Sequence, residues 1–207
     1  MGMKRFISHL HVSAAFLIAA LTFNACTPQS GNTEEANTAS VVQTSGDNLD
    51  VKVLNGQYDL NTKLFNNALV NISESEANQQ FNGTANNVKR IAGHALFLNY
   101  SLANLLAVES QNPYDAQFGI GKPFDPNATY PTLEKIISDW NGLSPKVRAA
   151  LEEMTKDELD SDSPFPIPYS EQTIRGIISF QMHHLGYHIG QVGIYRKFLG
   201  KESMSYQ

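Results

Sequence analysis

The stretch from residue 170 to residue 199 constrains the fold more than any other part of the chain. It has the length of about eight helical turns, and at about 100° per residue Gln181, His184, His188 and Gln191 fall within about 60° of one another. Apolar side chains flank this polar row on both sides: Ile174, Ile178, Leu185, Ile189 and Val192 on one flank, and Phe180, Tyr187, Ile194 and Phe198 on the other. We therefore expect a helix that presses its polar row into the interior of a helical bundle.

Three more long helices are predicted upstream, because apolar residues recur there at spacings of three and four. They span about 52–72, 84–108 and 132–154, with Thr84 as the N-cap of the second. No segment alternates apolar and polar residues in the manner of a strand. The expected fold class is an all-α four-helix bundle. The apolar stripe of the second predicted helix consists of Ile91, His94, Leu98, Leu102 and Leu105.

Short sequence patterns predict the structure of the segments that connect these helices. The patterns Ser73-Glu-Ser-Glu76 and Thr155-Lys-Asp-Glu158 have the form of a capping box and predict two short helical turns. Prolines and glycines predict loops over 112–130 and 161–169. Pro145 either kinks the third long helix or begins a continuation of it, because proline is tolerated at a first helical position.

Two of the histidines in the last helix have the spacing of a metal-binding pair. His184 and His188 are four residues apart and share a helix face, and His94 lies on the apolar stripe of another helix. A divalent transition metal such as zinc, nickel or iron would satisfy three inward imidazoles at once. The alternative is a cluster of histidines that hydrogen-bond to core groups. His183 points about 100° away from His184 and is expected at the surface.

Another face of the last helix carries small residues that allow a backbone to approach closely. It is expected to pack either against a helix of the same bundle or against a second subunit in a homodimer. The residues of this face are Ser179, Met182, Gly186, Gly190, Gly193 and Lys197.

The first 50 residues are expected to direct and tether the protein rather than to fold with it. Residues 1–25 have a basic start and a short apolar run, as in a signal peptide. Cys26, the only cysteine, follows this run in the position of a lipidated lipoprotein cysteine. Residues 26–50 are polar and read as a flexible tether, and residues 51–207 form the domain. A lipid anchor in the membrane of the bacterial cell envelope is expected, and secretion or a periplasmic location is the alternative.

Charge and cysteine content exclude several kinds of function. Removal of residues 1–25 would delete two basic residues and no acidic one, leaving 13 Lys plus Arg against 20 Asp plus Glu and a formal charge of −7. This charge argues against a nucleic-acid partner. With Cys26 at the processed terminus, no thiol remains for a disulfide or a nucleophile, so catalysis would depend on histidine, carboxylate, hydroxyl or metal.

The helix order and two histidine motifs resemble the DinB-like superfamily of metal-binding four-helix bundles, which includes thiol-dependent transferases. The motifs are Asn87-x6-His94 and His184-x3-His188-Ile-Gly-Gln191, and the resemblance covers about 52–200. It implies that His94, His184 and His188 are metal ligands facing an open coordination position. Asn87 and Gln191 lie one to two turns from these ligands and are candidates for contacts with a ligand or a substrate.

Two classes of function follow from these observations. The first is a metal-dependent transferase or hydrolase that acts on an unknown small-molecule substrate. The second is a non-catalytic metal- or ligand-binding envelope lipoprotein, and a purely structural envelope protein is a third interpretation. No carboxylate lies on the histidine row, and Glu109 is about four turns from His94, so the sequence offers no general base for a hydrolase.

Overall fold

The computed structural model describes residues 48–81, 85–123, 125 and 127–206. The predicted signal peptide 1–25, Cys26 and nearly all of the predicted tether lie outside these residues. The prediction of Thr84 as the N-cap of the second long helix is wrong, because that helix begins at Val88 and the Asn87 side chain caps it. The described part of the chain forms seven helices and no strand, in agreement with the predicted all-α class. None of these helices is both long enough and apolar enough to cross a membrane. The helices are α1 (Leu49–Leu69), α2 (Glu74–Ala77), α3 (Val88–Leu105), α4 (Asp115–Phe118), α5 (Leu133–Glu152), α6 (Lys156–Asp160) and α7 (Ile174–Phe198).

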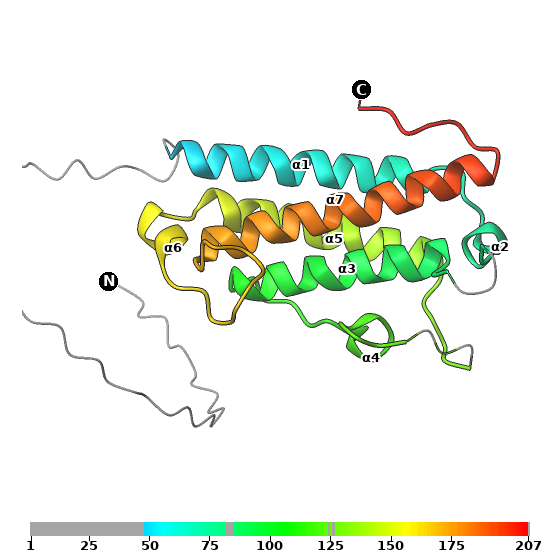
Figure 1. The fold of residues 1–207 in the computed structure, drawn as a ribbon, viewed down its shortest axis with the longest axis horizontal. Helices are drawn as coiled ribbons and strands as arrows, with labels where there is room; N and C mark the ends of the chain where they lie inside the picture. The colour runs from blue at the N-terminus through cyan, green and yellow to red at the C-terminus, as the bar shows by residue number, and fades with distance from the viewer. Residues whose placement is uncertain (1–47, 82–84, 124, 126, 207) are drawn as a thin grey trace, which may run out of the picture. The chain divides into compact units, whose positions relative to one another are not determined.

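The four long helices form a bundle in which α1 and α3 each pack against both α5 and α7 (Figure 1). At one end, Glu74 accepts hydrogen bonds from the backbone N–H of Leu133 and from Lys89, so α3 and α5 begin side by side. At the opposite end, an ion pair between Asp50 and Arg175 joins the beginnings of α1 and α7. The helices within each of these pairs are therefore parallel, and residues 106–132 must cross the length of the bundle between α3 and α5.

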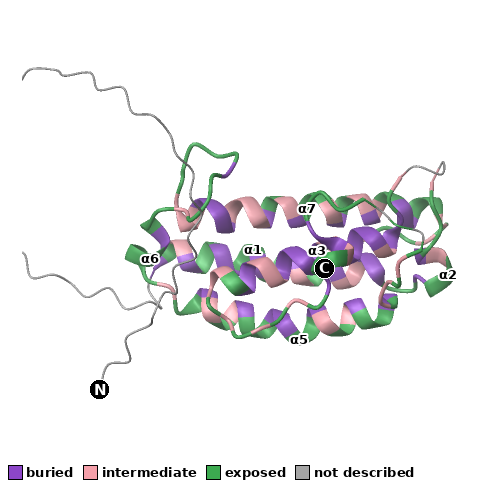
Figure 2. Ribbon diagram, turned by 90° about the horizontal axis from the view of Figure 1, so that it is seen from below, coloured by how far each residue is buried: buried purple, intermediate pink, exposed green. Residues whose placement is uncertain are grey.

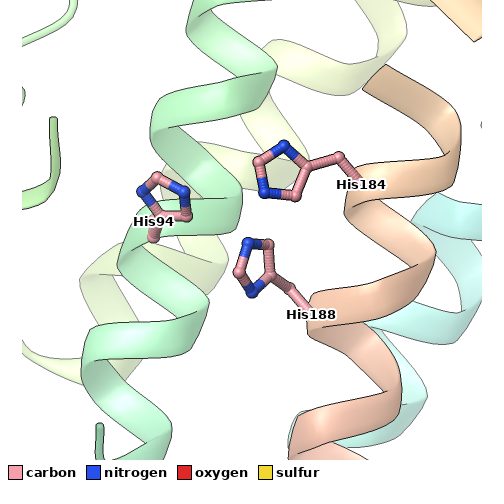
Figure 3. Close-up of side chains that lie close together, drawn as sticks. All are labelled: His94, His184 and His188. Atoms are coloured by element: carbon pink, nitrogen blue, oxygen red, sulfur yellow. The ribbon is translucent and has the colours of Figure 1, made fainter. Parts of the chain in front are cut away.

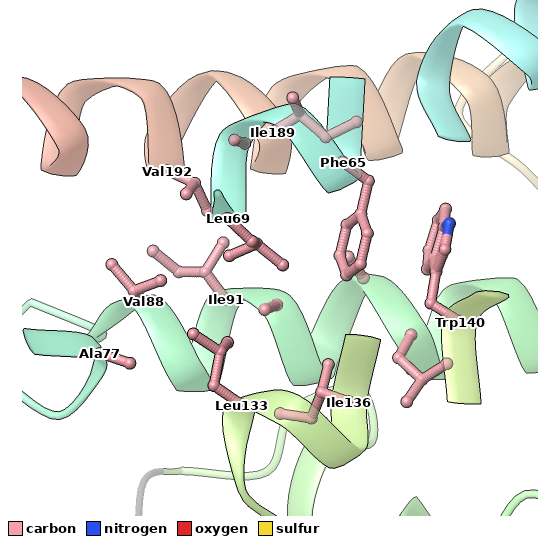
Figure 4. Close-up of a cluster of buried hydrophobic side chains, with 14 of the residues drawn as sticks. Phe65, Leu69, Ala77, Val88, Ile91, Leu133, Ile136, Trp140, Ile189 and Val192 are labelled. Atoms are coloured by element: carbon pink, nitrogen blue, oxygen red, sulfur yellow. The ribbon is translucent and has the colours of Figure 1, made fainter. Parts of the chain in front are cut away.

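Buried apolar residues make up the interior of the bundle, and Figure 2 marks buried positions along each of the four long helices. The Trp140 side chain is completely buried and stacks on Phe65, with ring centroids 4.0 Å apart. Ile189 and Val192 of α7 belong to the same cluster (Figure 4). This apolar interior fixes the face that α3 and α7 present to each other.

Some helix boundaries differ from the predicted ones, because side-chain caps and contacts of the connecting segments decide where a helix begins. α7 begins at Ile174 rather than at 170, because Thr173 caps it and pairs with Asp162 in an isolated antiparallel bridge. The predicted loop 112–130 contains the one-turn helix α4. Pro145 lies inside a continuous α5, and both predicted capping boxes are present, in α2 and α6.

The expectation that both apolar flanks of the last helix are buried is wrong. Ile178, Leu185, Ile189 and Val192 are buried, with Ile174 partly buried. On the opposite flank Phe180 is partly buried, but Tyr187, Ile194 and Phe198 are 59, 60 and 65% exposed. The physical reason is that, among the described helices, α7 packs mainly against α1, α3 and the short α6, and this leaves the other flank without a long helix beside it. The histidine row consequently lies at the edge of the core and is half-buried.

Part of the small-residue face of α7 is occupied by the same chain. A Cβ atom added to Gly186 would meet the Asn61 side chain of α1 at 3.8 Å, and one added to Gly193 would meet the methyl carbon of Met204 at 2.7 Å. Met204 belongs to the C-terminal segment, which is held on α1 by the mutual hydrogen bonds of Asn67 and Ser205. Packing within one chain therefore accounts for this part of the face, and the homodimer remains a prediction.

Candidate metal centre

The bundle brings together the three histidines that the sequence singles out. His94 is in the middle of α3, and His184 and His188 are on successive turns of the antiparallel neighbour α7. One ring nitrogen of each histidine lies within 4.8 Å of those of the other two, and all three rings point into the same space (Figure 3). The ring centroids of His94 and His188 are 4.9 Å apart, and those of His184 and His188 are 4.7 Å apart.

His94 is oriented by the segment that crosses the bundle between α3 and α5. Its Nδ1–H donates to the backbone carbonyl of Phe118 over 2.7 Å. A carbonyl oxygen only accepts hydrogen bonds, so Nδ1 carries the proton and Nε2 has a free lone pair. Phe118 reaches this position because Gly93 leaves room for its ring: a Cβ atom on Gly93 would lie 2.1 Å from Cζ of Phe118.

Arg90, one turn before His94 on α3, attaches the same segment to the bundle. Its guanidinium donates to the carbonyl oxygens of Gln117 and Lys122, on either side of Phe118. The guanidinium carbon also lies 5.6 Å from the centroid of the Phe118 ring. The side chain is only 7% exposed, and this burial lowers the pKa of its guanidinium.

His188 is oriented by side chains of its own helix. Its Nδ1–H donates to Oε1 of Gln191 over 2.8 Å, and Nε2 of Gln191 donates to the hydroxyl of Tyr187 over 3.1 Å. This arrangement leaves Nε2 of His188 as the acceptor nitrogen. That atom is buried and has no hydrogen-bond partner among the described residues, which is costly for a polar atom inside a protein.

The electrostatic environment keeps all three imidazoles neutral at neutral pH. Burial lowers the pKa of His188 to about 4, with a smaller lowering from His94 and His184. Burial also lowers the pKa of His94 and of His184, and the charge of Arg90 adds to the effect at His94. Metal ions bind neutral imidazole through a nitrogen lone pair, so this donor set fits a transition-metal ion without the release of protons at pH 7.

The structure places the other sequence-predicted residues at different distances from the three histidines. Gln191 contacts His188 directly. Asn87 lies two turns before His94 and is the N-cap of α3, where its Oδ1 accepts from the backbone N–H of Arg90 and its Nδ2 donates to the Asn78 carbonyl. Both polar atoms of Asn87 are therefore used in holding the start of α3. His183 is exposed, as its helical phase predicts.

A small pocket of about 150 Å³ opens beside the histidines, and His94 and His188 form part of its wall. Sequence reasoning missed Arg90, Phe118 and Lys122, which surround this pocket or support it. The position of Arg90 could have been predicted from the sequence, because Arg90 precedes His94 by four residues and so shares its helix face. The role of Phe118 could not have been predicted, since it contacts His94 through its backbone carbonyl and lies 24 residues away in the sequence.

A comparison with known protein families finds one family whose model covers these residues. The family model of the DinB superfamily matches residues 57–192, a range that includes all three histidines. No curated protein and no solved structure matches the chain.

Gly93→Ala is expected to destabilise the protein by about 1–3 kcal/mol, because the new methyl group would occupy the space of the Phe118 ring. Gly142→Ala is the matched control, since a Cβ atom there meets nothing within 4 Å and alanine is the better helix former by about 0.5–1 kcal/mol. Urea denaturation of the full chain measures both changes. Equal stabilisation by the two substitutions would contradict the close contact of Gly93 and Phe118.

The metal-free protein is expected to lose stability as the pH falls from 6.5 to about 4. Over this range His188 binds a proton in the unfolded chain, at its ordinary pKa of 6.5, but stays neutral in the folded protein, where its pKa is about 4. The thermal midpoint of His188→Gln should fall less steeply over this range, and the two proteins should behave in parallel above pH 7. An identical decline in both proteins would show that His188 is not held neutral by the fold.

Proposed function

The chain belongs to the DinB superfamily, and we propose that it binds a divalent transition-metal ion through His94, His184 and His188. The observation that carries this proposal is the unpartnered, buried Nε2 of His188, which faces two further neutral imidazoles. A hydrogen-bonded histidine cluster would have given this atom a donor. Zinc, nickel and iron all accept imidazole ligands, and a site of this kind suits each of them.

The protein's own groups hold the three donors in a defined arrangement. The Phe118 carbonyl and Oε1 of Gln191 each accept the Nδ1 proton of a histidine, which directs Nε2 of His94 and His188 toward the shared space. A bound ion of this class supplies Lewis-acid chemistry to a water molecule or a substrate atom.

The residues around the three histidines fit a reaction in which the metal ion activates a bound molecule better than a hydrolysis that needs a carboxylate base. Among the described residues, no Asp or Glu lines the pocket beside His94 and His188, and none belongs to the histidine group. A metal-dependent transferase therefore fits the site better than a hydrolase that relies on a carboxylate. A non-catalytic metal-binding protein would use the same three ligands.

Elemental analysis and calorimetric titration with Zn²⁺ test the metal site in the purified full chain. The wild type should bind one ion per chain. Both His94→Ala and the double variant His184→Ala with His188→Ala remove metal ligands, so each should weaken Zn²⁺ binding by more than ~100-fold. Removal of a hydrogen-bond partner of a ligand costs only ~10- to 100-fold. His183→Ala is the matched control, because this histidine is adjacent in sequence but exposed, and it should bind Zn²⁺ like the wild type. Absence of binding in the wild type, or full affinity in the double variant, would overturn the proposal.

We propose that this metal-binding domain is a lipoprotein of the bacterial cell envelope. The support is in the sequence: a basic start, an apolar run and the single cysteine, Cys26, directly after it. The polar residues 26–50 would then separate the domain from the membrane.

The anchor can be tested with Cys26→Ala, which should move the protein from the membrane fraction to the soluble fraction of the cells that express it. A serine elsewhere in residues 26–50, such as Ser30→Ala, is a neutral control for changes in this segment. Continued membrane association of Cys26→Ala would contradict lipidation at this residue.

A further inference from the structure

The pocket beside His94 and His188 has an unusual charge distribution. Arg90 and Lys122 contribute to its lining, together with Asn86 and the two histidines, and no acidic side chain of the described residues lies there. Arg90 is 7% exposed and forms no ion pair with a carboxylate in the described part of the chain. A buried cation without an anionic partner is costly, so its position next to the histidines calls for an explanation.

The hydrogen bonds of Arg90 account for only part of its donor capacity. One terminal nitrogen donates to the Gln117 carbonyl and the other to the Lys122 carbonyl. A guanidinium has five N–H donors, and its fork matches the two oxygens of a carboxylate. The side chain is therefore fixed at the pocket wall with donors beyond those that these two bonds use, and Lys122, which also lines the pocket, is exposed.

We infer that this pocket binds the carboxylate group of a small anionic substrate, with Arg90 as the main contact and Lys122 as a second positive charge. This inference rests on the proposed function in one respect: the substrate would lie next to the metal ligands His94 and His188. Three neutral histidines leave the full charge of a divalent ion uncompensated, which adds to the preference for an anion. The pocket volume of about 150 Å³ exceeds the ~30 Å³ of a single water molecule and suits a small group rather than a large ligand.

Acetate and its uncharged counterpart acetamide are suitable probes, because they have nearly the same shape and differ in charge. Binding is measured by NMR titration of the full chain, in the metal-free and the Zn²⁺-loaded forms, from the shifts of the Arg90 guanidinium and histidine ring signals. The wild type should bind acetate and not acetamide. Arg90→Met should weaken acetate binding by about tenfold or more, and Lys122→Met by a smaller factor.

Controls separate a local contact from a general effect of charge. Lys146→Met removes one positive charge from an exposed position on α5 and should leave acetate affinity unchanged. Arg90→Lys keeps the charge without the fork and should bind acetate with intermediate affinity. If Arg90→Met does not fold, as judged by circular dichroism, Lys122→Met and Arg90→Lys still test the pocket.

The two proposals fail in distinguishable ways. Equal binding of acetate and acetamide, or acetate affinity unchanged in the foldable variants at Arg90 and Lys122, would overturn the carboxylate pocket while leaving Zn²⁺ binding intact. Loss of Zn²⁺ binding in the wild type would overturn the metal site, and the metal-free titration would still decide whether the pocket binds acetate.

Discussion

The hydrogen bond from His94 to the Phe118 carbonyl connects two parts of the protein that are far apart in the sequence. It joins the centre of α3 to the segment that crosses the bundle before α5. Because α3 and α5 are parallel, the chain needs this long connection in any case. The protein uses it to orient a histidine, and Gly93 provides the necessary space beside that histidine. This contact sets the tautomer of His94, and the hydrogen bonds of Arg90 to Gln117 and Lys122 hold the same segment in place.

The two helices contribute to the histidine group in different ways. α7 supplies His184 and His188 with their spacing already set by the helical repeat, and it orients His188 through Gln191 on the next turn. α3 supplies only His94 and relies on Phe118, the last residue of α4, to hold its ring. The group therefore combines a rigid pair with a third member whose orientation depends on tertiary structure.

The parts of this arrangement that depend on a helical repeat could be predicted from the sequence, and the parts that depend on contacts with the segment between α3 and α5 could not. The pairing of His184 with His188, the surface position of His183 and the closeness of Gln191 all follow from residue spacing on one helix. The inward side of His94 followed from its place on an apolar stripe. The Phe118 carbonyl carries no side-chain signal, so nothing in the sequence reveals its contact. The burial of both flanks of α7 was predicted wrongly, because an apolar residue such as Ile194 does not reveal how many helices surround it.

Tyr187 lies at the surface, but its hydroxyl takes part in the hydrogen bonds that orient a histidine of the metal-binding group. The residue is 59% exposed, yet its hydroxyl accepts the hydrogen bond that orients the Gln191 amide, and Oε1 of this amide in turn accepts the hydrogen bond of His188. Replacement by phenylalanine would preserve almost all of the shape and leave that amide free to flip. Position 187 should therefore vary less among related chains than its exposure suggests, and a surface redesign of this domain should leave the residue in place.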